Sequence, residues 1–331
     1  MKAIRTHQAG GPETLTLDEV DVPTPGKGEV LVAVKACAIN YPDTLMIRDL
    51  YQFKPERPYS PGGEIAGVIE ALGEGVEGHA VGDIVMAGIG NGGLAEQVVV
   101  PADRMFPVPE GVAPEKAASL LMTYGTTIHG LKDRGHIKEG DTVLVLGAAG
   151  GVGLSAVELA KAFGARVVAA VSSEDKGEVA KKAGADAVVI YAKEEMDKAA
   201  SKELAQKFKE ACGPEGANIV YDIVGGQYSE PALRAIAWEG RFLVVGFPAG
   251  IAKMPLNLTL LKSCDICGVF WGAFTAREPV RFRAQVDELF DLLKAGRIDP
   301  LVSETFPLER AGDAIAKLEN RQAVGKLVVT M

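Results

Sequence analysis

The chain has 331 residues, of which 47% are hydrophobic and 24% are charged. This balance excludes a disordered or fibrous protein, and the length suits two domains with a large core in each. The formal net charge is −9, so the surface repels nucleic-acid phosphates on average, and the sequence shows no basic patch. Four scattered cysteines are too few for a secreted disulfide scaffold of this length.

The first residues do not resemble a targeting segment. They read Met-Lys-Ala-Ile-Arg and turn polar at once, without the apolar core of a signal peptide. No apolar run approaches the roughly 20 residues that a membrane span needs. We expect a cytoplasmic enzyme that binds neither nucleic acid nor membrane.

Residues 1–125 are dominated by short β-type runs, which glycine and proline interrupt. The runs lie at residues 30–34, 65–70, 83–86 and 97–100. This pattern predicts a compact, mostly β domain.

From residue 126 to 263 the pattern changes to alternating strands and helices. Such alternation predicts an α/β domain with parallel strands and crossover helices, in which ligands bind at the turns that end the strands. Strands are predicted at residues 142–146, 166–171, 187–190, 219–224 and 241–245, and helices at 152–163, 176–183, 192–211 and 231–237.

Residues 264–331 return to a mixed pattern, with an amphipathic helix near 280–295 and a closing strand at 325–330. We expect this stretch to rejoin the first domain. The predicted division is therefore 1–125 with 264–331 in one domain, and 126–263 in the other.

The most specific local signal is a Gly-rich turn at residues 147–153, between an apolar strand and a helix. Small residues let a pyrophosphate approach free backbone N–H groups at the positive end of a helix. An ordinary β–α turn usually carries fewer glycines. We predict a dinucleotide site whose pyrophosphate contacts are Ala149, Gly150, Gly151 and Val152.

The end of the next strand indicates which dinucleotide binds. An NAD enzyme needs a carboxylate there for the ribose 2′-hydroxyl, whereas this chain has Ser172 and Ser173, with Lys176 nearby. Hydroxyls and an ammonium group bind a 2′-phosphate, so the predicted cofactor is NADPH. Glu174 and Asp175 leave the use of NADH open, unless they only begin a solvated helix.

Several motifs together resemble one enzyme family. They are Asn40-Tyr-Pro-Asp43, Tyr51, Pro58-Tyr-Ser-Pro-Gly-Gly-Glu-Ile-Ala-Gly67, Gly82-Asp83, the turn at 147–153, and Tyr221-Asp-Ile-Val-Gly225. Over its whole length the chain resembles the quinone oxidoreductase (zeta-crystallin-like) branch of the medium-chain dehydrogenase/reductase superfamily. The resemblance implies a GroES-like, mostly β catalytic domain and a Rossmann domain with a doubly wound parallel sheet.

The resemblance also implies catalytic residues. Asn40, with Asp43 close behind, is expected to direct its amide to the nicotinamide ribose or the substrate oxygen, although Asn beside Pro is also typical of a turn. Tyr51 is expected over the substrate as a donor or an aromatic wall, or else packs with its aromatic neighbour. Thr126 is expected to face the nicotinamide, ahead of Thr123 and Thr127, and all three are possible helix caps.

Further cofactor contacts follow from the same resemblance. Tyr191 is expected beside the 2′-phosphate and Lys326 at the diphosphate, although a strand-end Tyr is often structural and a terminal-strand Lys is often solvated. Backbone contacts with the nicotinamide carboxamide are expected at Gly246, Phe247, Phe270, Trp271 and Gly272.

No metal is expected. The positions that match the catalytic zinc ligands of zinc alcohol dehydrogenases are Asn40, Gly63 and Met122, none of which binds Zn²⁺ well. A short loop at residues 90–93 replaces the structural-zinc lobe. The pair Cys264 and Cys267 has no second ligand pair, which favours two packed thiols.

Without a Lewis acid, a conjugated acceptor that spreads negative charge is favoured over an ordinary ketone. The predicted function is a zinc-independent, NADPH-dependent reductase that transfers hydride to a quinone or an α,β-unsaturated carbonyl compound. One alternative is an enoyl reductase for a small acid or thioester such as acryloyl-CoA or 2-haloacrylate. Another is an NADPH-binding structural or RNA-binding zeta-crystallin-like protein. Strand-type residues 266–269 predict edge pairing in a homodimer.

Overall fold

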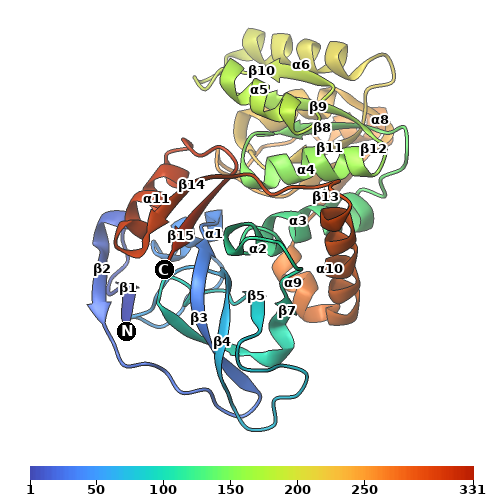
Figure 1. Cartoon of the computed structure of the whole chain (residues 1–331). Coiled ribbons are helices and arrows are strands. Elements are labelled where there is room, and N and C mark those ends of the chain that lie inside the picture. The colour runs from blue at the N-terminus through green and yellow to red at the C-terminus, as the bar shows by residue number, and fades with distance from the viewer. The chain divides into compact units, whose positions relative to one another are not determined.

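The computed structural model describes all 331 residues and divides the chain into two compact units (Figure 1). The first unit comprises residues 1–122 and 300–331, and the second comprises residues 123–299. The chain therefore leaves the first unit and returns to it. The predicted α/β class, with a mostly β domain and a parallel-sheet domain, is confirmed.

The second unit is built on a six-stranded, wholly parallel sheet. The spatial order β10-β9-β8-β11-β12-β13 makes the first strand a central one, with the chain winding outward to either side, as in doubly wound folds. The strands are β8 (Thr142–Leu146), β9 (Arg166–Val171), β10 (Ala187–Ile190), β11 (Ala217–Asp222), β12 (Ile236–Val244) and β13 (Asp265–Gly268).

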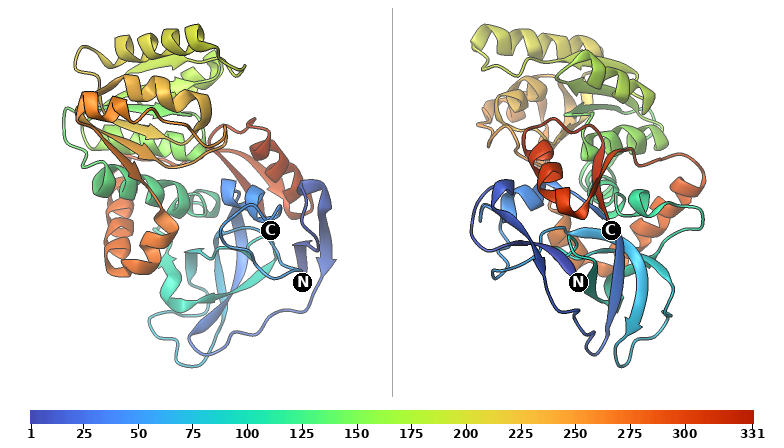
Figure 2. Two further views of the ribbon diagram at one scale, coloured as in Figure 1. Left: turned by 180° about the vertical axis from the view of Figure 1, so that it is seen from behind. Right: turned by 60° about the vertical axis from the view of Figure 1, so that its left-hand side comes forward.

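Helices cover both faces of this sheet (Figure 2). One core cluster joins alternate residues of β8 and β9, such as Leu144 and Val168, to Leu204 and Phe208 of the helix α6. The residues that alternate with these are equally buried and point to the other face, so both faces are apolar: Val143, Val145, Val167, Ala169 and Val171. The helices are α3 (Leu121–Ile128, which begins in the first unit), α4 (Gly151–Ala162), α5 (Glu174–Lys182), α6 (Lys198–Cys212), α7 (Ser229–Arg234), α8 (Asn257–Lys262), α9 (Trp271–Arg277) and α10 (Pro279–Lys294).

The first unit has a hairpin of β1 and β2 and a mixed seven-stranded sheet. Its closing strand, β15, pairs with β3 from the beginning of the chain, and β14 lies outside β15. The strands are β1 (Lys2–Thr6), β2 (Leu15–Glu19), β3 (Glu29–Ala38), β4 (Glu64–Leu72), β5 (Ile84–Gly88), β6 (Gln97–Pro101), β7 (Met105–Pro107), β14 (Val302–Pro307) and β15 (Lys326–Thr330), and the helices are α1 (Tyr41–Met46), α2 (Pro114–Ala117) and α11 (Ala311–Glu319).

The division observed differs from the expected one at its second boundary. Residues 264–299 group with the parallel sheet rather than with the first unit. The reason is that β13 is hydrogen-bonded to β12 as a sixth parallel strand, and α9 and α10 follow it directly. Only residues 300–331 rejoin the first unit.

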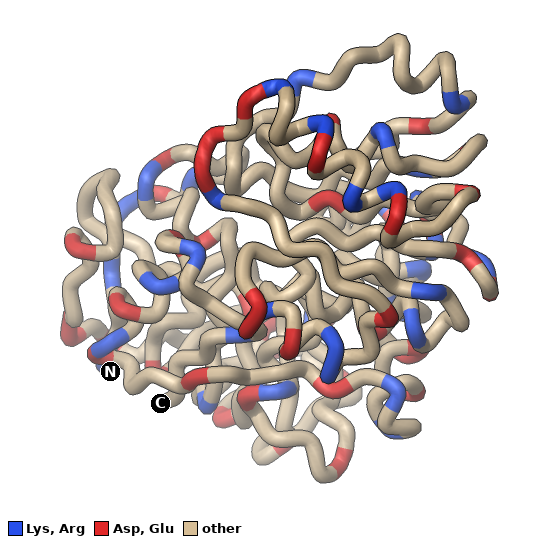
Figure 3. The backbone as a smooth tube through the Cα atoms, turned by 90° about the horizontal axis from the view of Figure 1, so that it is seen from above, with Lys and Arg blue, Asp and Glu red and all other residues tan.

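The structure has no helix that is both long and apolar enough to cross a membrane. Acidic and basic positions are interspersed along the backbone in Figure 3, in keeping with many short ion pairs such as Lys161–Asp186 and Lys132–Glu288. All four cysteines are buried and free.

Candidate active site

The residues predicted to bind a dinucleotide follow five of the six strands of the parallel sheet, β8, β9, β10, β12 and β13, with one exception. The Gly-rich turn follows β8, Ser172 and Ser173 follow β9, and Tyr191 follows β10. Gly246 and Phe247 come after β12, and residues 270–272 come after β13. Since the carboxyl ends of parallel strands share one edge, these segments gather where doubly wound sheets bind ligands. The exception is Lys326, which belongs to the first unit.

The Gly-rich turn has the geometry that a pyrophosphate requires. Gly147 adopts a left-handed conformation, with φ of +72°, which favours glycine. A β-carbon on Gly153 would lie 2.2 Å from the carbonyl oxygen of Gly147, so only glycine lets α4 pack this closely on the end of the strand. Gly150 is the N-cap of α4 and has no side chain to cover the first free N–H groups of the helix. The turn therefore fits a dinucleotide phosphate.

The serines after β9 have different surroundings. Ser173 is the N-cap of α5, and its hydroxyl oxygen accepts the backbone N–H of Lys176 at 3.4 Å. Glu174 and Asp175 are exposed in the first turn of α5, where carboxylates favour a helix. Ser172 is half-buried and does not cap the helix.

Two lysines near this strand end act on each other through their charges. Burial lowers the pKa of the partly buried Lys176, and the charge of Lys193 lowers it further. Two ammonium groups in one place attract an anion. Lys193 was missed in the sequence because it follows a different strand, and only the pairing of β9 with β10 brings it close.

The aromatic candidates divide into packed and exposed residues. Tyr191 is buried, and its ring lies 4.6 Å from that of Tyr228. Trp271 is partly buried and packs on Gly125 of α3. Phe247 and Phe270 are about half exposed, at 48% and 57%.

Thr126 differs from its neighbours on α3. It is partly exposed, whereas Thr123 and Thr127 are buried. The Thr127 hydroxyl lies 2.7 Å from the Ser155 hydroxyl and 3.1 Å from that of Tyr221, which ties α3 to α4 and to β11. Thr123 and Thr127 lie within α3 rather than at its N-cap.

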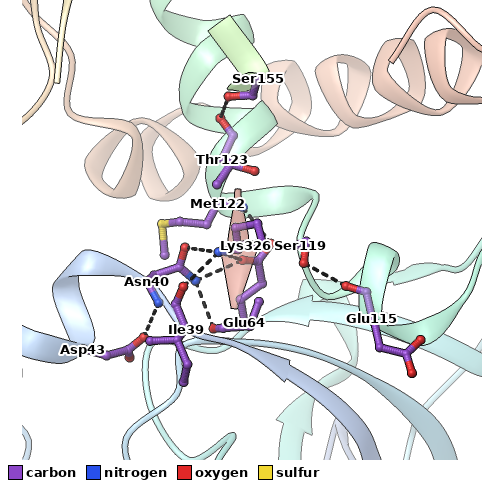
Figure 4. A network of polar contacts seen from close by, with 11 residues as sticks. Ile39, Asn40, Asp43, Glu64, Glu115, Ser119, Met122, Thr123, Ser155 and Lys326 are labelled. Atoms are coloured by element: carbon purple, nitrogen blue, oxygen red, sulfur yellow. Dashed lines mark hydrogen bonds and ion pairs between the residues drawn. The ribbon is translucent and has the colours of Figure 1, made fainter. Parts of the chain in front are cut away.

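In the first unit, Asn40 and Lys326 belong to a buried polar network (Figure 4). The Lys326 ammonium donates to Asn40 Oδ1 at 2.6 Å and to the carbonyl oxygen of Ile39 at 3.1 Å. Asn40 Nδ2 donates to Glu64 Oε2 at 3.0 Å, and the backbone N–H of Met122 donates to Glu64 Oε1 at 2.9 Å.

Charge balance explains why this network is tolerated inside the protein. Glu64 Oε2 lies 3.8 Å from the Lys326 ammonium, and both side chains are almost fully buried. Burial raises the pKa of Glu64 and lowers that of Lys326, and each shift is opposed by the charge of the other residue. Both charges are shielded from bulk solvent, so each depends on the other.

Asp43 lies at the start of α1, beside this network. Its carboxylate accepts the backbone N–H of Asn40 at 2.7 Å and that of Gly62 at 3.1 Å. Burial raises its pKa to about 6, although both hydrogen bonds and Lys326 act in the opposite direction. Tyr51 is partly buried, and burial together with the Asp43 charge raises the pKa of its phenol. Its aromatic neighbour Phe53 is about half exposed.

Two of the expected positions need correction. The Asn40 amide points into the protein and is bonded to Ala38, Glu64 and Lys326, rather than being free for a ribose or a substrate. Lys326 is neither solvated nor free for a diphosphate, because the residue is only 4% exposed and its ammonium is bonded within the network. Glu64 was missed, although a carboxylate at the head of an apolar strand, directly after two glycines, was a visible signal.

The positions that match zinc ligands do not form a metal site. The Asn40 amide is already bonded, and Gly63 has no side chain that could bind a metal. No group of three or more His, Cys, Asp or Glu side chains is arranged to hold a metal ion. The residues present therefore do not fit zinc.

Comparison with known proteins identifies the family. Residues 26–110 match the alcohol dehydrogenase GroES-like domain, and residues 151–294 match the zinc-binding dehydrogenase family. A quinone oxidoreductase-like protein 2 homolog from Nematostella vectensis is 35% identical over 99% of this chain and 88% of its own length. The chain belongs to the quinone oxidoreductase branch of the medium-chain dehydrogenase/reductase superfamily.

Solved structures of this quinone oxidoreductase family share the complete fold. A mycobacterial protein solved in complex with NADPH is 33% identical, with a TM-score of 0.91 over 100% of both chains. The quinone oxidoreductase of Escherichia coli, also complexed with NADPH, is 30% identical, with a TM-score of 0.90 over 100% of both chains. The expected GroES-like and Rossmann domains are confirmed.

Proposed function

We propose that this oxidoreductase is a zinc-independent, NADPH-dependent reductase whose acceptor is a quinone or an α,β-unsaturated carbonyl compound. The observation that carries the proposal is the Gly147–Gly153 turn, whose geometry fits a dinucleotide pyrophosphate at the start of α4. When bound, NADPH supplies a hydride. The similar mycobacterial and E. coli proteins were both solved with NADPH, which supports the same cofactor here.

The choice of the phosphorylated dinucleotide is supported by the two lysines near the end of β9. Lys176 and Lys193 repel each other, and a 2′-phosphate between them relieves this repulsion. Ser172, which is not needed as a helix cap, supplies a hydroxyl at the same strand end. Glu174 and Asp175 belong to the solvated start of α5 and are not assigned to the ribose.

Steady-state kinetics with both cofactors test this assignment. Loss of one charge-assisted contact costs about 1.5 to 3 kcal/mol, so Lys176→Ala and Lys193→Ala each raise the KM for NADPH about 10- to 100-fold and leave the KM for NADH unchanged. Lys202→Ala, which removes an exposed lysine of α6, is the matched control. Equal losses with both cofactors contradict the proposal.

The side chains of the first unit favour a conjugated acceptor. No metal ligand set is present to stabilise an alkoxide, and the Lys326 ammonium is committed to buried partners. A conjugated acceptor reduces the need for such help, because its negative charge spreads over several atoms. We assign the proton donor to Tyr51, whose partly buried phenol carries a proton at neutral pH. Asn40 and Asp43 then hold the start of α1 instead of touching the substrate.

An anaerobic panel that monitors NADPH oxidation tests the acceptor. Quinones and enones are the expected substrates, and preferential turnover of acryloyl thioesters or 2-haloacrylate favours the enoyl reductase alternative. If the phenol donates the proton, Tyr51→Phe lowers kcat about 100-fold. An unchanged kcat means that Tyr51 contacts the substrate only as an aromatic wall. Negligible turnover of every acceptor refutes the reductase, and a gel shift at physiological salt then tests the RNA-binding alternative.

We also propose that the protein forms a homodimer through the edge of the six-stranded sheet. β13 is an edge strand, and large apolar side chains near it are exposed: Trp238 of β12, Leu260 and Leu261 of α8, and Ile266. Exposed apolar edges of this kind pair with a second copy. Light scattering of Ile266→Lys is expected to show monomers. Val280→Lys, at an equally exposed position on α10, is the control that stays dimeric.

A further inference from the structure

The helix α9 begins directly at the turn where the nicotinamide side of the cofactor site is proposed. Phe270 is its N-cap and Trp271 its first residue, and the carbonyl oxygen of Phe270 accepts the N–H of Phe274. A helix of seven residues has few internal hydrogen bonds. Its position therefore depends on the side chains that hold it.

The first contact holds the beginning of α9 against α3. A β-carbon on Gly125 would lie 2.8 Å from Nε1 of Trp271, so the indole lies directly on the α3 backbone. The other side of the indole meets Phe282 of α10 edge-on, with ring centroids 5.5 Å apart. Gly125 is the neighbour of Thr126, so this contact links the two segments assigned to the nicotinamide.

The second contact lies one helical turn further along. Phe274 is buried and stacks on His129, with ring centroids 4.0 Å apart and an interplanar angle of 14°. His129 opens a π-helical turn (His129–Arg134) that continues α3. Its Nδ1 lies 2.7 Å from Oδ2 of Asp133, in the same turn.

Asp133 is in turn held from α10. Gln285 Nε2 donates to Asp133 Oδ2 at 2.8 Å, and the Arg281 guanidinium forms an ion pair with the same carboxylate. Arg281 also lies over the ring of Phe274, 5.7 Å from its centroid. The imidazole is thus fixed by its carboxylate partner, and the phenyl ring contacts both the imidazole and the guanidinium.

This arrangement is more elaborate than the packing of a short helix requires. An apolar side chain in place of His129 would fill the same space without burying a polar group, and π-helical turns are often found at functional sites. The stacked ring fixes both the position and the rotation of α9, and so the direction in which residues 270–272 face.

We propose that His129 and Asp133 are positioning residues which, through Phe274, set the turn at residues 270–272 for the nicotinamide half of NADPH. The inference rests on the proposed function, because it assigns this turn to the nicotinamide. It does not involve the adenosine half of NADPH, which is assigned to Lys176 and Lys193 after other strands of the sheet.

Two ligands separate the halves of the site. NADPH occupies both halves, whereas adenosine 2′,5′-bisphosphate carries only the phosphorylated adenosine. Calorimetric titrations of the full-length protein give the Kd of each ligand. We expect Phe274→Leu and Asp133→Ala to raise the Kd for NADPH at least fivefold and to change the Kd for adenosine 2′,5′-bisphosphate less than twofold. Phe274→Tyr keeps an aromatic ring for stacking and is expected to retain wild-type binding of both ligands.

The alternative outcomes are distinct. If both ligands weaken together, the contact serves only the stability of the fold, and the inference is wrong. It is also wrong if neither ligand weakens, or if Phe274→Tyr behaves like Phe274→Leu. Should the wild-type protein bind neither ligand, the proposed function fails instead, and this result is seen before any variant is compared.

Discussion

The buried pair of Lys326 and Glu64 gives the sharpest prediction for stability. Lys326→Met keeps an unbranched side chain of similar length but removes the ammonium, which leaves the Glu64 carboxylate without its only nearby cation. Asn40 Oδ1 and the Ile39 carbonyl oxygen lose their donor at the same time. The variant therefore has one uncompensated charge and two unpaired acceptors in the core of the first unit.

The cost follows from this loss. Breaking a buried ion pair by removing one partner costs about 3 to 5 kcal/mol, which corresponds to a fall in melting temperature on the order of 10 °C. The loss depends on pH. Lys326 lowers the pKa of Glu64, so its removal raises that pKa further above the ordinary value of 4.5. A carboxyl whose pKa is raised by folding destabilises the fold increasingly as pH rises, so the deficit of the variant is smallest in acid and largest above neutrality.

Urea unfolding of the wild type and the variant, at several pH values, measures this deficit. The double variant Lys326→Met with Glu64→Gln removes both charges of the pair and is expected to recover a large part of the loss, because Asp43, which keeps its two backbone N–H donors, is then the one carboxyl left in the network. A loss below about 1 kcal/mol in the single variant would refute the reasoning. So would a double variant that is as unstable as the single one.

Three further substitutions test local geometry. Gly153→Ala places a β-carbon against the preceding turn and is expected to weaken NADPH binding at least tenfold, as calorimetry would show; unchanged binding would remove the turn from the site. Tyr221→Phe removes a buried hydroxyl bonded to Thr127 and is expected to cost about 1 kcal/mol in thermal melts, whereas no loss would mean that this contact adds nothing. Ser229→Ala removes a donor to the buried Asp222 carboxylate and is expected to cost about 2 kcal/mol by urea unfolding; an unchanged midpoint would be the contrary result.

The parallel sheet was largely predictable from the sequence. β8, β9 and β10 have the predicted bounds, because each is a short apolar run that follows a glycine turn. β12 was predicted to begin at residue 241 but begins at Ile236, and the predicted helix before it ends at Arg234 instead of residue 237. The sequence Trp238-Glu239-Gly240 does not indicate a strand. Within this segment Glu239 adopts a positive φ of 57°, which is unusual for a strand residue.

The Gly-rich turn could be predicted from the sequence, whereas the network around Asn40 could not. The Gly-rich turn is local, so its function can be recognised within one short segment of sequence. The network around Asn40 is not, because its lysine lies 286 positions away and reaches it only through the pairing of β15 with β3. A lysine on a closing strand has no local signal of burial. Its role depends on a partner that the pattern of one strand does not specify.

The return of the chain to the first unit has a consequence for biosynthesis. Residues 123–299 are continuous, so this unit is complete while the ribosome is still translating. The first unit must wait for β15, and until then β3 lacks one of its neighbours and the Glu64 carboxylate lacks its cation. Long-range pairings of this kind form slowly. A chain that is released before residue 326 therefore holds a finished nucleotide fold beside an unfinished, aggregation-prone sheet, and the cell's chaperones and proteases can distinguish it from the complete protein.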